Sequence, residues 1–320
     1  MFRIGILGAA DIAFNKFIPA LMKVEGVECA GVASNSPDKL KRFVEKYNVH
    51  VYSSYNEVIG DDSVDCVYIP LPPAFHYEWA KKALLAGKHV FLEKPSTTSA
   101  DDTKELVGIA GEKGLVVQEN YMFQFHSQLN EIENFIASGE LGKLRLVRTS
   151  FGFPRRAEGD FRYVKELGGG TMMDNGGYTI KLIDMLLGES MRLVSSQLDY
   201  DEKTGIDIFG TAEFVNDDGV IAQAAFGMDC QYQCSLELWG SRGRLTTGRI
   251  YTAPDGFKPV ALVETGAGSR NVELPSCDAF EESIKMYLRA VEDERLRESM
   301  AHELVRQAEF VDDVRGMDRK

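Results

Sequence analysis

The sequence predicts an α/β fold: an N-terminal doubly wound parallel sheet, then a C-terminal α+β domain with a mostly antiparallel open sheet. Over the first ~120 residues, short β-branched apolar runs alternate with amphipathic helical stretches, the pattern of parallel βαβ units. After Met122 this alternation stops, and several strands follow one another directly. A chain of 320 residues has the length of about two domains, which we expect at 1–120 and 121–320.

The elements of the first domain can be placed in order. Strands are expected at Arg3–Leu7, Val27–Ala33, Val64–Ile69, His89–Leu92 and Leu115–Val117. Helices with apolar residues near helical spacing are expected at 12–24, 37–47, 75–86 and 100–111. In such a sheet, ligands bind outside the carboxyl ends of the strands.

The second domain is expected to begin with a helix near Gln128–Ala137 and a strand near Leu144–Phe151, with another helix after Gly170. Its clearest strand is Gln231–Leu238, where apolar and polar residues alternate strictly. One face of that sheet is therefore buried, and the other is wetted or lies at an interface. Residues 278–320 have a helical period and are highly charged.

The charge balance limits the possible partners. Lys and Arg total 36 against 49 Asp and Glu, a formal net charge of -13. Such a surface repels nucleic-acid phosphates and anionic lipids, so neither is an expected partner. A small phosphate-bearing ligand stays possible, because a pocket can hold local cations and backbone donors.

The sequence also predicts where the protein works. The chain enters a strand at once and shows no secretion signal, and no apolar run approaches the ~18 residues that span a membrane. The five cysteines form no C-x-x-C pair, and no cluster of His, Asp and Glu has ligand spacing. We therefore expect a cytoplasmic protein with free thiols and no metal site.

The first strand runs into Gly8-Ala9-Ala10-Asp11-Ile12, where a dinucleotide-binding turn of the form G-x-G-x-x-G/A would stand. Ala10 replaces the second glycine, so its methyl group must point aside or displace the phosphates slightly outward. The helix that follows has N-terminal amides that attract anions. These five residues are cofactor-binding candidates in a Rossmann-type domain; the alternative is merely a tight strand-to-helix turn.

The second strand ends in Ser34, Asn35 and Ser36, and Lys39 follows in the next helix. No acid stands at the tip of this strand, where an NAD enzyme usually places one against the ribose hydroxyls. The polar side chains can donate to a 2′-phosphate, and Lys39 can neutralise it. The sequence therefore predicts NADP rather than NAD; the alternative is a polar surface turn.

Two further loops leave the same edge of the sheet. After Tyr68, the residues Ile69, Pro70, Leu71 and Pro72 form a stiff extended wall on which a nicotinamide ribose could rest. His76 could join them or could simply be a histidine at a helix start. Glu93-Lys94-Pro95 projects a lysine, and a buried ammonium group held by a partner suits proton donation to a carbonyl oxygen. Alone, Lys94 would count as a surface lysine.

In the second domain, a glycine run at 168–170 precedes Asp174 and Tyr178. These two residues are four apart, so an α-helix would place them on one face. A carboxylate and a phenol together can orient a sugar hydroxyl and donate a proton to a developing alkoxide. The alternative is a helix cap and a core tyrosine.

Together these residues resemble the Gfo/Idh/MocA family of nicotinamide enzymes over nearly the whole chain. The most specific motifs are Glu93-Lys94-Pro95 and Gly168-Gly169-Gly170 followed by Asp174. The resemblance implies that Lys94, Asp174 and Tyr178 form the catalytic group. It also implies that Glu93 and Asn120 help to bind the cofactor.

A closer resemblance is to the nucleotide-diphosphohexose 3-ketoreductases of deoxysugar biosynthesis. It is carried by Gly8–Ala13, Tyr68–Pro73, Glu119–Phe123 and Asp160–Tyr163. It implies hydride transfer from NADPH to a keto group of a nucleotide-linked sugar, with Tyr178 or Lys94 protonating the oxygen. By the same resemblance, the substrate pocket is lined by Tyr121, Phe161 and Arg162, along with Asn120, Asp174 and Tyr178.

The resemblance further implies a homo-oligomer, a dimer or a tetramer, formed through the outer face of the second sheet. Two other functions stay open. One is oxidation of a free aldose or a dihydrodiol, which needs no surface for a diphosphate. The other is a non-catalytic regulator that binds the dinucleotide without turnover.

Overall fold

The computed structural model describes residues 1–157 and 159–317, and the chain falls into two compact units. The first unit holds Met1–Asn120 and Phe280–Ala308, and the second holds Tyr121–Ala279 and the residues from Glu309 onward. Residues 280–308 therefore belong to the first unit, whereas the sequence placed everything after residue 120 in the second. A helical period shows which face of a helix is apolar but not which sheet that face packs against.

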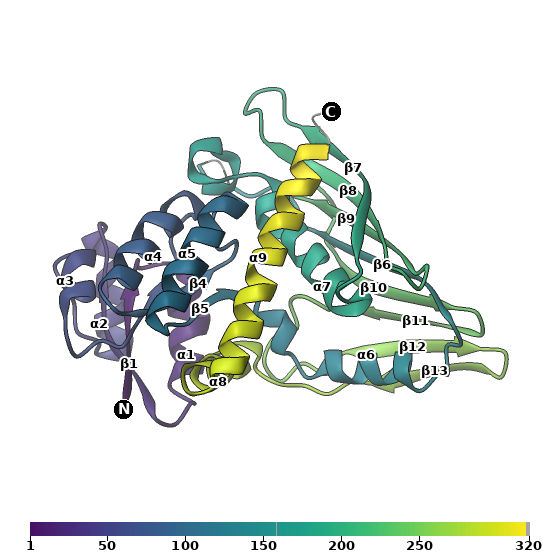
Figure 1. The fold of residues 1–320 in the computed structure, drawn as a ribbon, viewed down its shortest axis with the longest axis horizontal. Coiled ribbons are helices and arrows are strands. Elements are labelled where there is room, and N and C mark those ends of the chain that lie inside the picture. Colours follow the sequence, from purple (N-terminus) through teal and green to yellow (C-terminus); the bar gives the residue numbers. More distant parts are fainter. Residues whose placement is uncertain (158, 318–320) are drawn as a thin grey trace. The chain divides into compact units, whose positions relative to one another are not determined.

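The first unit contains a five-stranded sheet whose paired strands are parallel, in the order β2-β1-β3-β4-β5. Figure 1 labels β1, β4 and β5 of this sheet. Its strands are β1 Phe2–Leu7, β2 Val27–Ala33, β3 Cys66–Ile69, β4 His89–Glu93 and β5 Val117–Asn120. The central strand β3 is buried along its whole length. This confirms the doubly wound parallel sheet, because a parallel sheet covered on both faces gives strands that are apolar throughout.

Alternate strand residues pack against different helices. Leu7, Ile69 and Leu92 belong to a core cluster that includes apolar residues of α3, α4 and α5. On the other face, the ring of Phe17 stacks on that of Tyr68, with 3.8 Å between the ring centres. The ring centre of Phe91 lies 5.0 Å from that of Tyr287 in α8. The aromatic contact with Phe91 explains why α8 groups with the first unit. The helices of this unit are α2 Pro37–Tyr47, α3 Tyr55–Gly60, α4 His76–Leu85, α5 Ala100–Lys113 and α8 Ala279–Glu292. Helix α9 Glu294–Met317 belongs to the first unit up to Ala308 and to the second unit from Glu309.

Two features of these helices differ from the sequence expectation. The helix expected at 12–24 contains a π-helical stretch, η1 (Ala13–Phe17), followed by the short α1 (Ile18–Leu21). The six-residue α3 was not expected at all. It begins after Ser54, whose hydroxyl accepts a hydrogen bond from the Glu57 backbone N–H at 3.1 Å, the usual N-cap arrangement. Within the described part of the chain, no helix is long and apolar enough to cross a membrane.

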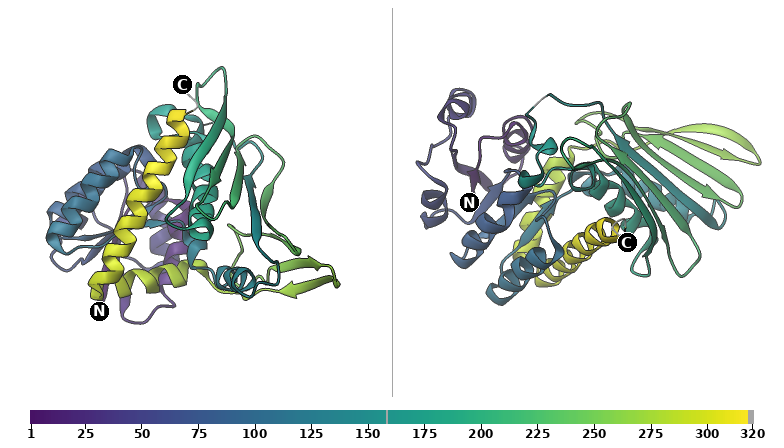
Figure 2. Two further views of the ribbon diagram at one scale, coloured as in Figure 1. Left: turned by 45° about the vertical axis from the view of Figure 1, so that its right-hand side comes forward. Right: turned by 90° about the horizontal axis from the view of Figure 1, so that it is seen from above.

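The second unit contains an eight-stranded sheet in the order β13-β12-β11-β10-β6-β9-β8-β7, shown from two directions in Figure 2. Among the described strands of this second sheet, only the pair β6–β9 is parallel, which confirms a mostly antiparallel sheet. The strands are β6 Leu144–Gly152, β7 Arg192–Tyr200, β8 Asp207–Val215, β9 Ile221–Gly227, β10 Gln233–Gly240, β11 Gly243–Gly248, β12 Val260–Thr265 and β13 Gly268–Glu273.

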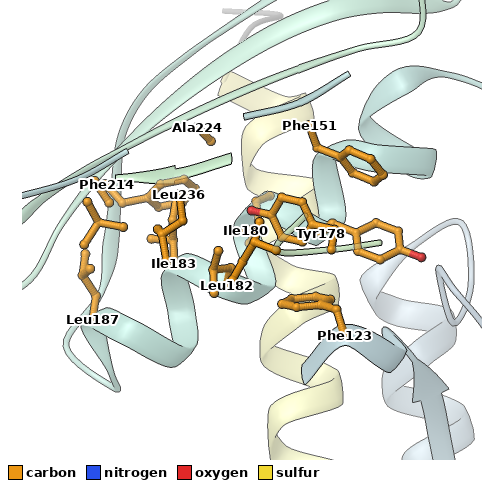
Figure 3. Packing of buried hydrophobic residues seen from close by; sticks show 14 of the residues in the cluster. Phe123, Phe151, Tyr178, Ile180, Leu182, Ile183, Leu187, Phe214, Ala224 and Leu236 are labelled. Carbon is orange, nitrogen blue, oxygen red and sulfur yellow. The ribbon is translucent and has the colours of Figure 1, made fainter. Parts of the chain in front are cut away.

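One face of this sheet packs against α6 (Gln128–Ala137) and α7 (Gly177–Leu187). Ile180, Leu182 and Ile183 of α7 belong to the same buried cluster as Phe214 and Leu236 of the sheet (Figure 3). Burying each such side chain contributes about 1.5–3 kcal/mol. This packing fixes the position of α7, whose first turn carries Tyr178.

The segment before α7 is a π-helix, η6 (Met172–Gly176), rather than the regular helix that the sequence predicted. Asn175 is fully buried, and its amide donates to the carbonyl oxygens of Phe151 at 2.6 Å and Gly227 at 2.9 Å. A buried side chain thus ties this turn to β6 and β9. Gly170 is required just before it, because its φ is +119° and a Cβ there would meet the Asp207 carboxylate at 2.3 Å.

Candidate active site

The turn after β1 has the geometry of a phosphate-binding turn. Gly8 has a φ of +123°, and a Cβ there would meet the Leu71 side chain at 2.8 Å. Ala9 is buried, Ala10 is half-buried, and helical residues begin at Asp11. The missing side chain at Gly8 thus makes room for Leu71 of the loop after β3. The helix start that follows the turn supplies amides for an anion. These residues therefore fit a dinucleotide pyrophosphate.

Arg42 of α2 reaches this turn, which the sequence analysis missed. Its guanidinium pairs with the Asp11 carboxylate at 2.6 Å and donates to the Ala9 carbonyl oxygen at 3.3 Å. It also lies 4.6 Å from the centre of the Phe14 ring. Arg42 thus links α2 to the turn. A signal was available, since Arg42 stands one helical turn after Lys39.

The residues expected to recognise a 2′-phosphate lie between β2 and α2. Ser34 is half-buried and its hydroxyl accepts from the Ser36 backbone N–H at 3.1 Å. Asn35, Ser36 and Lys39 are exposed. Lys39 stands in the first turn of α2. All four residues follow the carboxyl end of β2, so they lie at the edge of the sheet where ligands bind in such folds.

The His76 side chain lies in the interior, whereas the sequence predicted it as a candidate contact to the cofactor. Its side chain is 0% exposed, with Nδ1 2.8 Å from the Pro95 carbonyl oxygen and Nε2 2.7 Å from that of Leu71. Both ring nitrogens therefore face backbone carbonyls. His76 joins the loop after β3, with the wall residues 69–72, to the loop that carries Lys94. Burial lowers the pKa of His76, although both carbonyls act to raise it.

Lys94 follows directly after β4 and is half-buried, and its peptide bond to Pro95 is cis. The preceding Glu93 carboxylate accepts from the Tyr68 hydroxyl at 2.8 Å and from the Asn120 amide at 2.9 Å. Burial raises the pKa of Glu93, while Asn120, Tyr68 and Lys94 act in the opposite direction. The structure thus brings Glu93 and Asn120 together in a buried network beside Lys94.

In the second unit, Asp174 is held by an arginine. The Arg162 Nε donates to the Asp174 carboxylate at 2.7 Å, and Nη1 donates to Asp160 at 3.1 Å. The guanidinium also stacks on Phe161 at 4.6 Å. Burial acts to lower the pKa of Arg162, but the two carboxylates outweigh it and the pKa is raised. Asp174, Arg162 and Phe161 thus form one cluster.

Tyr178 lies in an aromatic cage and is 7% exposed. The centre of its ring lies 4.9 Å from the ring centre of Tyr121, 5.2 Å from that of Phe151 and 5.6 Å from that of Phe123. Phe151 and Phe123 lie on opposite sides of it (Figure 3). Its hydroxyl donates to the Met122 sulfur at 3.7 Å. The sequence analysis missed Phe151 and Phe123 as neighbours, although Phe123 belongs to the segment Glu119–Phe123 that carried the resemblance.

Asp174 and Tyr178 lie in helical segments of different type. Asp174 lies in the π-helix and bonds to Arg162, whereas Tyr178 begins the regular helix inside its aromatic cage. A π-helical turn contains more residues than an α-helical one, so the four-residue rule does not hold across it.

Among residues 1–157 and 159–317, no group of three or more His, Cys, Asp or Glu could hold a metal ion.

A doubly wound parallel sheet with a glycine turn after its first strand is typical of the class of dinucleotide-binding proteins. Two protein-family models match the chain and agree with this class. Residues 2–121 match the model of the "oxidoreductase family, NAD-binding Rossmann fold", and residues 129–246 match the GFO/IDH/MocA C-terminal domain. The chain belongs to the GFO/IDH/MocA family, which confirms the family expected from its motifs.

Several relatives match over nearly the whole chain. The dTDP-3,4-didehydro-2,6-dideoxy-α-D-glucose 3-reductase of Actinomadura kijaniata is 36% identical, over 98% of this chain and 94% of its own length. The enzyme of the same name from Streptomyces violaceoruber is 37% identical over the same shares. The structure of KijD10, a 3-ketoreductase from Actinomadura kijaniata in complex with NADP and TDP-benzene, superimposes with a TM-score of 0.95 at 35% identity, covering 99% of this chain and 97% of KijD10.

The buried histidine makes folding stability depend on pH. Because the pKa of His76 in the folded protein lies below its ordinary value of 6.5, the unfolded chain binds the proton more tightly. The stability linked to His76 is therefore complete at neutral pH and declines as the pH falls through 6.5. In His76→Gln, we expect the slope of unfolding free energy against pH to drop by up to ~1.4 kcal/mol per pH unit.

Urea unfolding at several pH values from neutrality to about pH 5.5, above the range in which most carboxylates titrate, measures this slope. A slope in His76→Gln equal to that of the wild type would show that His76 takes up no proton on unfolding.

Proposed function

We propose that this protein is an NADP(H)-dependent ketoreductase that acts on a keto group of a nucleotide-linked sugar, of the 3-ketoreductase type. The observation that carries the proposal is the likeness to dTDP-sugar 3-reductases over 98% of the chain, at 36–37% identity. It extends to the structure of KijD10, which was determined in complex with NADP and TDP-benzene. The residues of the turn after β1 fit such a cofactor, as described above.

Different residues of the chain bind the cofactor, supply protons and orient the substrate. The dinucleotide, which supplies the hydride when it is bound, is held by Gly8 to Ile12 together with Ser34, Asn35, Ser36 and Lys39. Lys94 and Tyr178 hold protons that can pass to the oxygen of the reduced carbon, since an ammonium group and a phenol are both donors at neutral pH. The Arg162 guanidinium, which already holds Asp174 at 2.7 Å, orients the carboxylate toward a sugar hydroxyl.

The direct test is turnover of a thymidine-diphosphate-linked 3-keto sugar, followed by the loss of NADPH absorbance. We expect turnover with this substrate and none with the same sugar lacking the nucleotide. Equal turnover of a free aldose or a dihydrodiol would replace the proposal with the corresponding dehydrogenase. Tight NADPH binding without turnover of any of these compounds would favour a regulator.

Replacing Lys94 should remove catalysis and preserve cofactor binding. Lys94→Ala is expected to lower kcat by about 10²-fold or more, because a positioned proton donor is lost, with little change in NADPH affinity. Lys82→Ala is a suitable control, since that lysine pairs with Glu78 on the surface of α4. Steady-state kinetics and fluorescence titration with NADPH measure both quantities. Unchanged turnover in Lys94→Ala would remove Lys94 from the mechanism.

Replacing Lys39 should change the choice of cofactor. Lys39→Ala is expected to weaken NADPH by about tenfold and NADH by much less, because only NADPH carries the 2′-phosphate. Lys41→Ala is the matched control on the same helix, where Lys41 pairs with Asp38 at 3.1 Å. Titration of each variant with both cofactors gives the ratio of affinities. Equal losses for NADPH and NADH would contradict the contact between Lys39 and the phosphate.

We further propose a homo-oligomer formed through the outer face of the second sheet. Trp239 of β10 is 54% exposed there, and it pairs laterally with Leu146 of β6, which pairs with Ile221 of β9. An exposed apolar row of this kind is typical of an interface. Trp239→Arg should therefore lower the mass measured by sedimentation, whereas Met22→Arg, at a 73% exposed position in the first unit, should not. A monomeric wild type would end this proposal.

A further inference from the structure

Helix α8 supplies a buried hydroxyl to the network beside Lys94. The Ser283 side chain is fully buried, and its hydroxyl donates to the Asn120 side-chain oxygen at 2.9 Å. The Gln118 amide donates to the same hydroxyl at 2.8 Å. Ser283 lies 163 residues beyond Asn120 in the sequence, and neither the motifs nor the relatives' names point to it.

The direction of each hydrogen bond in this network is determined by its donors. The Glu93 carboxylate can only accept, so the Asn120 NH₂ group faces it and donates at 2.9 Å. The Asn120 oxygen therefore faces Ser283, whose hydroxyl donates to it and accepts from Gln118. If the Asn120 amide turned over, an oxygen would face the Glu93 carboxylate, and the Ser283 proton would lose its acceptor. Ser283 thus stabilises the orientation in which Asn120 can donate to Glu93.

We propose that Ser283 is a positioning residue for the reaction, acting through Asn120 and Glu93 on the loop that carries Lys94. Glu93 is the last residue of β4, and its carboxylate bonds to the Lys94 backbone N–H as well as to Tyr68 and Asn120. A carboxylate held from three directions fixes the start of the lysine loop. The turnover readout rests on the proposed function, so the test also includes a readout that needs no substrate.

The charge state of Glu93 provides that second readout. Burial raises the pKa of Glu93, and the Asn120 donor is the largest of the effects that lower it again. The titratable groups that face this carboxylate among the described residues are Tyr68 of β3 and Lys94, which directly follows β4. Losing the Asn120 donor should therefore raise the pKa of Glu93 further, so that the carboxyl takes up its proton at higher pH.

The first experiment compares Ser283→Ala with the wild-type holoenzyme. We expect kcat to fall about tenfold, the KM for the sugar to change little, and the acid limb of the kcat profile to move up by about one pH unit. Infrared titration should show the protonated-carboxyl band at higher pH in Ser283→Ala, and Glu93→Gln identifies that band. The infrared result is independent of turnover, so failure of the proposed function and failure of this inference can be told apart.

The matched control is Tyr287→Phe, which removes another fully buried hydroxyl from α8, four residues further on. That hydroxyl bonds to the Cys66 sulfur at 2.9 Å, outside the network. Its kcat and pH profile should stay at wild-type values even if its thermal stability falls. A shift of the acid limb equal to that of Ser283→Ala would mean that any lost α8 hydroxyl has this effect, which would overturn the inference.

A double-mutant cycle tests the route through Asn120. In an Asn120→Ala background, Ser283→Ala should change kcat by less than about twofold, because the residue through which it acts is gone. An equal loss in both backgrounds would show that Ser283 acts by another route. Ser283→Thr keeps the hydroxyl and should recover most of kcat. If Ser283→Ala does not fold, Ser283→Thr and Gln118→Met remain as two further variants for comparison with the wild type. Wild-type kcat and wild-type infrared titration in folded Ser283→Ala would refute the proposal.

Discussion

A carboxylate that leaves water must find donors, and in the first unit the buried Glu93 finds them in the Tyr68 hydroxyl and the Asn120 amide. This requirement links three neighbouring strands, since Tyr68 lies in β3, Glu93 ends β4 and Asn120 ends β5. The backbone N–H of Lys94 bonds to the same carboxylate. The position of the lysine therefore depends on a buried charge whose donors come from both sides of its strand. His76 completes the arrangement from the helix side, where it meets the carbonyl oxygens of Pro95 and Leu71.

In the second unit, a buried carboxylate is likewise held by a hydrogen-bond donor, which here is an arginine. Asp174 is almost fully buried, and Arg162 supplies the hydrogen bond and the opposite charge. A charged pair of this kind is costly to desolvate, and it is tolerated when the geometry is good and the remaining donors are used. Arg162 uses further donors on Asp160. Below the pair, the Asn175 amide holds the π-helical turn on two strands, so the carboxylate and the following Tyr178 are carried by backbone that is itself fixed.

Much of the fold could be predicted because it depends on local patterns. Apolar runs such as Arg3–Leu7 and Val27–Ala33 predicted β1 and β2 closely, and the alternation at Gln231–Leu238 predicted β10, which begins two residues later at Gln233. Features that depend on tertiary contacts could not be predicted. A helical period does not show that α8 packs against Phe91, nor that the turn at Met172–Gly176 widens to a π-helix. For the same reason the motifs identified Lys94 and Asp174, but not Arg42, Ser283 or the buried state of His76.

The two kinds of site residue also differ in what fixes them, and this affects how substitutions should be interpreted. Tyr178 stands in the first turn of α7, which is held by apolar packing, and its ring touches Tyr121 and Phe151. Apolar packing has no direction, so a volume-conserving change in that core moves the ring only slightly. Lys94 instead depends on directional hydrogen bonds around Glu93, each of which is either made or lost. Conservative changes near Lys94 that remove a single proton donor should therefore alter catalysis more sharply than larger changes in the apolar core beneath Tyr178.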